Sequence, residues 1–301
     1  MSDQDAVRRF VLQGGTVRGQ WVRLTSSWDA LREHVDYPEP VRDLLGEAAV
    51  AAVLLAATLK FEGTLTLQLQ GDGAVRLLVV QCSDKFELRA LARFNLAAVQ
   101  PDFSVLTGSG QLTVTVETAA NAAARYQGIV PLVGESLAEA LEHYCQQSEQ
   151  LPSVLRLSAD PYAATGVLLQ RLPMSGGIAV ADIPDNPDRL WDQASAALRA
   201  VPPADLLAGD SESLARRCGA GEDVRLFAPQ AVQFRCRCSH ERIADVLRSL
   251  GADELRSLIA EQGAVTVTCE FCQKPWRFDA IDVTELLQSA VPQPPASHRV
   301  N

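Results

Sequence analysis

Hydrophobic and polar residues along the first 180 positions follow two periods, and these periods predict strands and helices. Residues 64–70 read TLTLQLQ, so every second side chain is a leucine, as in a strand with one buried face. The turn-forming run Gly71-Asp72-Gly73 follows, and residues 75–81 predict the returning strand of a hairpin. We expect further strands at residues 87–94, 111–117, 154–159 and 166–172, and shorter β-like runs between residues 8 and 24.

Helical patterns separate these strands. Residues 39–61 carry apolar side chains on almost every face, which predicts a helix buried inside the domain. Ser136 and Glu139 have the spacing of a capping box, so another helix is expected to begin there. Its apolar face would hold Leu137, Leu141 and Tyr144. This mixture predicts an α+β fold for residues 1–180, a mixed β-sheet domain with packed helices.

Residues 181–232 have a different character, because five prolines interrupt them and nine acidic residues outnumber five basic ones. One helix can begin at Pro187, with Trp191 and Leu198 on a shared face, and a short helix is expected near residues 211–218. Such a segment is neither fully disordered nor a domain of its own. We therefore predict a helical, metastable linker.

Residues 233–287 predict a small C-terminal module, and residues 288–301 a frayed tail. The module contains two amphipathic helix patterns, one that begins after Ser239 and ends at Gly251, and one that ends at Gly263. The side chains expected to point inward are Ile243, Val246, Leu247, Leu250, Leu255, Leu258 and Ile259. Because so small a core contributes little stability, a bound metal would supply much of it.

Composition narrows the range of partners. The 301 residues include 27 lysines and arginines against 37 aspartates and glutamates, and no segment is basic, which argues against nucleic-acid binding. The most apolar run, residues 48–59, has about half the length of a membrane span, and the acidic N-terminus lacks the features of a secretory signal. We therefore expect a cytoplasmic protein without a membrane partner. Seven cysteines in a reducing compartment indicate metal or redox chemistry rather than structural disulfides.

Four cysteines form two close pairs, Cys236-x-Cys238 and Cys269-x-x-Cys272, with thirty residues between the pairs. Four thiolates at this spacing are typical of a tetrahedral site, and zinc is the ion that suits such a site best. A closed four-sulfur site leaves no position for water, and no catalytic motif occurs elsewhere, so we do not expect an enzyme. The spacing leaves open whether the site is an inert staple or a redox sensor, since a disulfide within Cys-x-Cys is strained and reducible.

The other cysteines and histidines have less specific patterns. We expect Cys82 and Cys145 to be buried thiols of the core. Cys218 follows two arginines, which predicts a lowered thiol pKa and an accessory redox role as the alternative to an inert one. His240 lies beside the first cysteine pair and is a candidate substitute ligand, although four cysteines already complete the shell.

The cysteine pattern and several further motifs resemble one family, the redox-regulated bacterial holdase chaperone known as the 33-kDa heat-shock protein. The similar N-terminal runs are LLAATLKFEG at residues 54–63, QLQGDG at 68–73, YQGIVPL at 126–132 and GESLAEALE at 134–142. The four cysteines match the family's metal centre without departure. The segment 181–232 matches it more in position and character than in sequence.

The resemblance implies a mechanism. In the reduced form one zinc ion per chain would be held by Cys236, Cys238, Cys269 and Cys272, and the chaperone would be inactive. Oxidation would form the disulfides Cys236–Cys238 and Cys269–Cys272, release the zinc and unfold the module and the linker. The apolar surface exposed in this way would bind unfolding client proteins without ATP, in a form that is typically a homodimer.

The resemblance also implies a role for each part of the chain. Residues 1–180 would bind clients and dimerise, residues 181–232 would be the metastable linker, and residues 233–287 would be the zinc-binding redox switch. We hypothesise that the linker covers the core in the reduced state through Trp191, Leu198, Leu206 and Leu207. The alternative function is a constitutive zinc-ribbon module for protein interaction, without redox switching.

Overall fold

The computed structural model describes residues 4–12, 15–118, 121–173, 187–219 and 221–289. The chain divides into two compact units, Met1–Arg235 and Cys236–Asn301. Both units combine strands and helices, so the α+β prediction is confirmed. None of the described helices has the length and apolarity needed to cross a bilayer.

Six strands of the first unit form sheet A, in which every described pairing is antiparallel. The strands lie in the order β10-β1-β2-β9-β8, and β11 pairs with the N-terminal end of β1, at Ala6 and Val7. Their bounds are β1 Ala6–Leu12, β2 Val17–Leu24, β8 Ser153–Ala159, β9 Ala164–Arg171, β10 Val224–Leu226 and β11 Gln230–Ala231. The sheet thus joins the N-terminal hairpin to strands that come far later in the sequence.

The other six strands of this unit form sheet B, in the order β12-β5-β4-β3-β6-β7. Their bounds are β3 Gly63–Gln70, β4 Val75–Ser83, β5 Glu87–Phe94, β6 Gln111–Thr118, β7 Asn121–Pro131 and β12 Gln233–Phe234. The predicted hairpin is confirmed as β3 and β4, and the leucines of β3 are buried, as its period-two pattern predicts. Strands β7 and β12 have no counterpart among the predicted elements.

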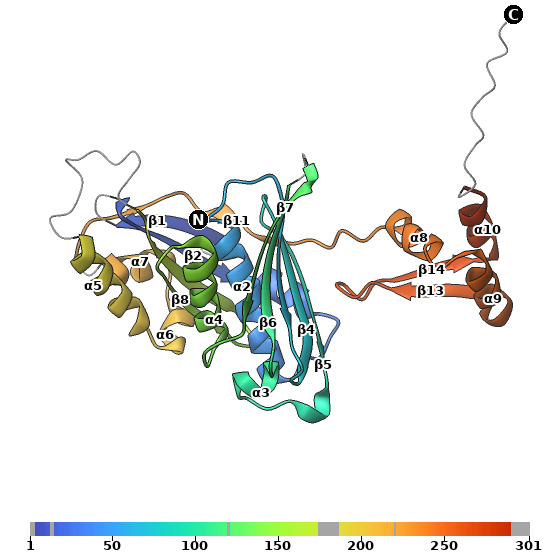
Figure 1. Cartoon of the computed structure of the whole chain (residues 1–301), viewed down its shortest axis with the longest axis horizontal. Helices are drawn as coiled ribbons and strands as arrows, with labels where there is room; N and C mark the ends of the chain where they lie inside the picture. The colour runs from blue at the N-terminus through green and yellow to red at the C-terminus, as the bar shows by residue number, and fades with distance from the viewer. Residues whose placement is uncertain (1–3, 13–14, 119–120, 174–186, 220, 290–301) are drawn as a thin grey trace, which may run out of the picture. The chain divides into compact units, whose positions relative to one another are not determined.

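Helix α2 (Glu39–Ala56) lies between the two sheets and contacts strands of both (Figure 1). Its apolar residues are buried on every face, as the sequence predicts, and they belong to the larger apolar cluster of the unit. The helix ends earlier than the expected residue 61. The shorter helices of the core are α1 Ser26–Arg32, α3 Phe103–Thr107, α4 Leu137–Tyr144, the 3₁₀ turn η2 Leu96–Ala98 and the π-helical turn η3 Cys145–Glu149.

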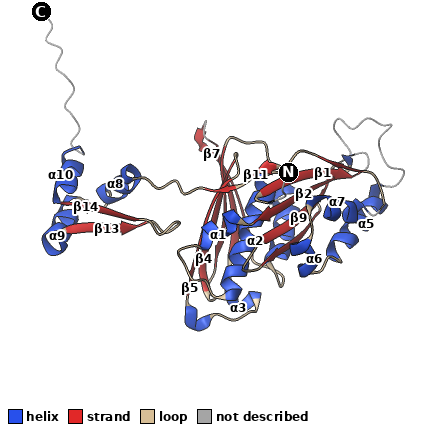
Figure 2. Ribbon diagram, turned by 180° about the vertical axis from the view of Figure 1, so that it is seen from behind, coloured by secondary structure: helices blue, strands red, loops and turns tan. Residues whose placement is uncertain are grey.

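Three helices cover the face of sheet A that is turned away from α2. They are α5 Pro187–Arg199, α6 Pro203–Ala208 and α7 Ser211–Gly219, and Figure 2 shows them grouped beside β1, β2 and β9. Phe10 and Trp21 of the sheet pack with Leu198 and Leu206 of these helices in a second apolar cluster. The described part of the predicted linker, residues 187–219 and 221–232, therefore lies on the core, and its later residues contribute β10 and β11 to sheet A.

The described part of the second unit contains three helices and a two-stranded sheet (Figure 1). Their bounds are α8 His240–Arg248, α9 Ala252–Gln262, β13 Ala264–Thr268, β14 Pro275–Asp279 and α10 Ala280–Ser289. The buried apolar cluster comprises Ala244, Leu247, Leu255, Val265, Phe278, Val283 and Leu286. The expectation that Val246 and Leu250 point inward is wrong, because 56% and 51% of these residues are exposed. Helix α10 occupies part of the expected tail, whose residues 290–301 lie outside the described part.

Candidate metal centre

Two short backbone segments of the second unit carry the four paired cysteines. Cys236 and Cys238 lie in the extended connection that follows β12 and leads into α8. Cys269 directly follows β13, and Cys272 lies in the turn before β14. In this turn Gln273 adopts a left-handed conformation (φ 52°), and Cys269 exchanges backbone hydrogen bonds with Lys274 and Gln273 at 3.0 and 2.8 Å. The tight turn directs its two sulfurs to one side.

The sulfur positions fit a single metal ion. All four Sγ atoms lie within 4.8 Å of one another, and no other group of three or more cysteine, histidine or acidic side chains in the described residues is arranged in this way. The Sγ–Sγ distance is 3.7 Å between Cys236 and Cys269 and 3.4 Å between Cys238 and Cys272. A tetrahedron with Zn–S bonds of about 2.3 Å has sulfurs about 3.8 Å apart. The donor set and its spacing therefore suit zinc.

The thiols of this cluster differ in their ease of ionisation. Burial raises the pKa of Cys238 and that of Cys272. Burial acts in the same direction on Cys236, but the backbone N–H of Cys238 and hydrogen bonds from three neighbouring thiols lower the net pKa of Cys236. The pKa of Cys236 is thus shifted in the opposite direction from those of Cys238 and Cys272. A divalent cation bound by cysteine sulfurs favours their thiolate form.

Aromatic side chains pack beside the cysteine cluster. The His240 ring stacks on Phe278 with centroids 4.3 Å apart and meets Trp276 edge-on at 6.2 Å. Ser239 caps α8 by accepting a hydrogen bond from the Arg242 N–H at 3.2 Å, as the sequence predicts. The stacking gives His240 a structural role in the small core, and the four-sulfur cluster does not include it.

The other three cysteines lie in the first unit and are fully buried, Cys82 on β4, Cys145 at the end of α4 and Cys218 on α7. Burial raises the pKa of the Cys145 thiol to about 12, and that of Cys218 also to about 12. The prediction of a lowered pKa for Cys218 is therefore wrong. Arg217 does act in the expected direction, but the loss of solvation outweighs it.

A second region of functional interest is the interface between sheet A and helices α5–α7. Leu198 and Leu206 are completely buried in it, Trp191 packs against it, and Leu207 is only half-buried and lies outside the cluster. Three of the four side chains in the hypothesised linker face therefore pack in or against this cluster. Polar contacts between the core and these helices surround the cluster. Two core arginines donate to backbone carbonyls of the helical segment, Arg156 to Val201 and Arg23 to Leu207. Two further contacts join Arg199 to Glu142 and Arg8 to Ser211.

One partly buried acid was not singled out from the sequence. Glu47 lies on α2 beside Asp43, and burial, with a further contribution from the charge of Asp43, raises the pKa of its carboxyl to about 8. Arg156 acts in the opposite direction without reversing the shift. The signal in the sequence is the position of a glutamate within the apolar run that follows Gly46.

Comparisons with known proteins agree on one family. The model of the Hsp33 protein family matches residues 5–279. The 33 kDa chaperonin of Pseudomonas paraeruginosa is 42% identical to this chain, with 99% of the chain and the whole relative covered. The 33 kDa chaperonin of Nitrosococcus oceani is 38% identical over the same shares.

A solved structure is similar over nearly the whole chain. The 33 kDa chaperonin of Thermotoga maritima aligns with a TM-score of 0.79 and covers 95% of this chain and 98% of its own. Its sequence is 21% identical, so this likeness concerns the fold alone.

Proposed function

The chain belongs to the Hsp33 protein family, and from this premise we propose that it is a redox-regulated, ATP-independent holdase chaperone of the cytoplasm. In this proposal residues 1–180 bind unfolding client proteins, residues 181–232 form a metastable linker, and residues 233–287 form the switch. The observation that carries the proposal is the gathering of four cysteine sulfurs within 4.8 Å in a unit whose described part buries only seven apolar side chains.

In the reduced form we assign the metal to Cys236, Cys238, Cys269 and Cys272, as one zinc ion per chain. When bound, the ion would hold the four sulfurs as thiolates and join the connection before α8 to the turn between β13 and β14. The small apolar cluster of the unit gives this cross-link a large share of the stability. The linker helices stay on sheet A in this state and cover Phe10 and Trp21.

Oxidation reverses this arrangement. Cys236 forms a bond with Cys238, and Cys269 with Cys272. Each pair gives up two electrons, and a peroxide molecule takes them up with two protons to give two molecules of water. Because disulfide sulfurs are not thiolates, the four residues would no longer hold the ion, and the unit would unfold. The linker then leaves sheet A, and its apolar face becomes available to clients and to a second copy of the chain.

The decisive experiment compares the reduced chain with the chain treated with peroxide at mildly elevated temperature. We expect suppression of the aggregation of a thermally unfolding client only after oxidation, together with release of one zinc per chain and a shift from monomer to dimer in light scattering. Equal suppression in both states would support the constitutive interaction module instead. The exposed residues Val246, Leu250 and Ile281 offer such a module an apolar surface.

Peptide mapping tests the disulfide pairing separately. Two Sγ–Sγ contacts join the cysteine pairs crosswise, Cys236 with Cys269 at 3.7 Å and Cys238 with Cys272 at 3.4 Å. We expect mass spectrometry of the oxidised chain to find Cys236–Cys238 and Cys269–Cys272, because the ion leaves and the unit opens as the first bond forms. Crosswise disulfides would keep the two segments tied together and would contradict the unfolding step.

A further inference from the structure

Strand β12 is a short addition to the edge of sheet B. It consists of Gln233 and Phe234 and runs parallel to β5, whereas all other described strand pairings are antiparallel. About 140 residues separate β12 from its partner strand, so no hairpin imposes the pairing. The strand ends one residue before Arg235, and Cys236 begins the second unit.

Backbone and side-chain contacts define what this edge accepts. The N–H groups of Gln233 and Arg235 donate to the carbonyls of Phe86 and Leu88 at 3.1 and 2.9 Å. The guanidinium of Arg235 pairs with the carboxylate of Glu87, whose side chain is only 15% exposed.

The side chains of the segment complete this recognition pattern. Val232 is 3% exposed within the larger apolar cluster, and Phe234 packs against the same cluster. The occupant is therefore an extended segment with two apolar side chains two residues apart, followed by a cation.

The residue that offers the first carbonyl is strained. Phe86 has a φ of 56°, a left-handed conformation that costs a bulky side chain about 1–3 kcal/mol. Its ring is nearly buried in the apolar cluster, and its N–H donates to the Ser83 carbonyl at 3.0 Å. Backbone strain of this kind persists where the surroundings enforce it, and it is concentrated at binding sites. Here it turns the Phe86 carbonyl toward the segment that pairs with β5.

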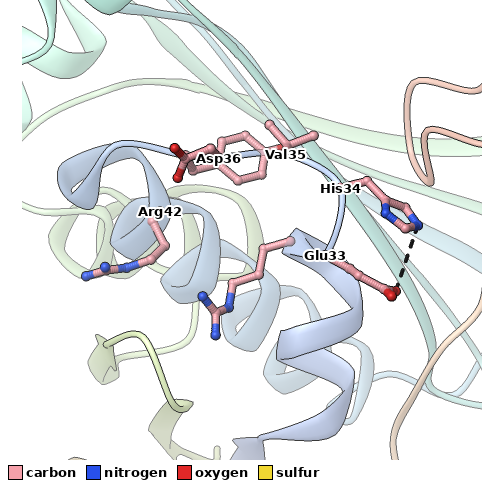
Figure 3. A pocket seen from close by; sticks show the side chains of 7 residues that line it. Glu33, His34, Val35, Asp36 and Arg42 are labelled. Carbon is pink, nitrogen blue, oxygen red and sulfur yellow. Dashed lines mark ion pairs between the residues drawn. The ribbon is translucent and has the colours of Figure 1, made fainter.

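The edge of β5 extends past the two residues that pair with β12, and it ends where Tyr37 contacts the strand. Backbone groups on this side of β5 alternate, since Leu88 accepts from Arg235 and the Ala92 N–H donates to the Tyr37 hydroxyl at 3.4 Å. Ala90 lies between them and faces the same edge. Tyr37 also lines a pocket of about 360 Å³ whose other residues are mostly charged, among them Glu33 and Asp36 (Figure 3). The loop that carries Tyr37 therefore ends the edge at which an added strand can pair, and this edge spans Phe86 to Ala90.

We propose that the edge of β5 from Phe86 to Ala90 is a strand-addition site for client proteins, and that β12 fills it in the inactive state. The site accepts an extended client segment that imitates Val232–Arg235. Main-chain hydrogen bonds provide a share of the affinity that does not depend on sequence, which suits a chaperone with many clients. Tethering gives β12 a high effective concentration at the site, so clients compete only after it leaves. The proposal rests on the proposed function, since oxidation at Cys236 and beyond is what frees β12.

A peptide with the sequence of Gln230–Arg235 tests this site. It carries a fluorophore at its N-terminus and the photoreactive residue benzoylphenylalanine in place of phenylalanine. We expect the oxidised full chain to bind it at least about tenfold more tightly than the reduced chain, and irradiation to attach it within Phe86–Ala90. Absence of binding, or attachment only at other residues, overturns the proposal.

A charge exchange sharpens the test. Glu87→Arg places two cations together, so binding of this peptide to the oxidised variant should weaken about tenfold. A peptide that ends in glutamate instead of arginine should recover the loss on the variant and bind the unmodified chain poorly. Equal binding of both peptides to both proteins contradicts the assigned contact.

Suppression of client aggregation is measured on the same oxidised samples. This separates a failure of the strand-addition site from a failure of the proposed function. If the oxidised chain suppresses client aggregation but does not bind the peptide on β5, only the strand-addition site is wrong. If oxidation produces no suppression at all, the proposed function itself fails, whatever the peptide does.

Discussion

The first unit buries two apolar clusters, one on each face of sheet A, whereas the described part of the second unit buries seven apolar side chains among three helices and two strands. The first unit thus contains a core large enough to fold without cross-links. The second unit also brings together four cysteine sulfurs, and burial raises the pKa of two of them, Cys238 and Cys272. In the proposed function, this difference in core size becomes a difference in control, since only the second unit would depend on metal–sulfur bonds that an oxidant can remove.

The largest expected effect comes from removing one ligand of the second unit. Cys269→Ser should abolish binding of one zinc per chain and unfold this unit, because structural zinc contributes on the order of 10 kcal/mol to small domains. Metal analysis and limited proteolysis of the reduced variant check this. Cys82→Ser, at a buried thiol of the first unit, is the matched control and should keep the zinc. If the Cys269→Ser chain retained one zinc per chain, Cys269 would not be a required ligand, and the proposed dependence of the second unit on the four cysteines would be contradicted.

Within the first unit, we expect helices α5–α7 to separate from sheet A more easily than the rest of the unit unfolds. Leu206→Ser removes a completely buried side chain and should destabilise the docking of α6 by about 2–5 kcal/mol, which raises chaperone activity in the reduced state. Leu207→Ser alters the neighbouring residue, which is half-buried and outside the cluster, and should leave reduced activity near its basal value. The measurement is suppression of client aggregation under reducing conditions.

The double variant Trp191→Ser with Leu198→Ser extends this test to α5. It should activate the reduced chain at least as strongly as Leu206→Ser, since Leu198 is completely buried in the same cluster. Reduced activity that stays at zero in this variant would refute the role assigned to the linker face.

Ionisation of Glu47 should have a smaller effect, on the pH dependence of the stability of the first unit. Burial raises the pKa of Glu47 to about 8, above its unfolded value of about 4.3, so folding favours the protonated acid. This contribution to stability is fully present below about pH 4.3 and is lost as the pH rises to about 8. Part of the Glu47 side chain remains accessible, so solvent screening reduces the effect.

Glu47→Gln keeps a neutral side chain at every pH. We expect the variant to gain about 1–3 kcal/mol over the unmodified chain between pH 4.5 and pH 8.5, measured by urea unfolding at both values. Glu39→Gln, on the exposed first turn of the same helix, controls for the loss of a negative charge. A constant difference between the unmodified chain and Glu47→Gln across this range would show that the carboxyl is already ionised at low pH.

The sequence predicts those parts of the fold that local patterns determine. The alternating leucines of β3 identify a strand, and the apolar run of α2 identifies a buried helix, because each pattern matches the period of its element. The four cysteines are found because ligand spacing is also a local signal. Their gathering within 4.8 Å depends on the turn at Gln273 and on the approach of a segment thirty residues away.

The parts that sequence reasoning missed depend on distant partners. Strand β7 has no regular alternation and is a strand because β6 pairs with it along its length. Strand β12 has only two residues, and β5 determines its conformation. On α8 the inner face centres on Ala244 and Leu247, so Val246, about 100° around the helix from Leu247, faces solvent. Local apolarity identifies a helix here but not which side is buried.

The smallest predicted effect compares two identical caps in the two units. Ser136 begins α4 and Ser239 begins α8, and each hydroxyl accepts a hydrogen bond from the N–H three residues on at 3.2 Å. Substitution of either serine by alanine should cost about 1 kcal/mol locally.

In the first unit a large core absorbs this loss. In the second unit it lowers the barrier to opening, so Ser239→Ala should release zinc at a lower peroxide concentration than the unmodified chain, as followed with a chelating dye. Ser136→Ala should release it at the same peroxide concentration as the unmodified chain. If the two variants have the same peroxide threshold, the second unit is no more marginal than the first, and core size does not explain why the switch lies where it does.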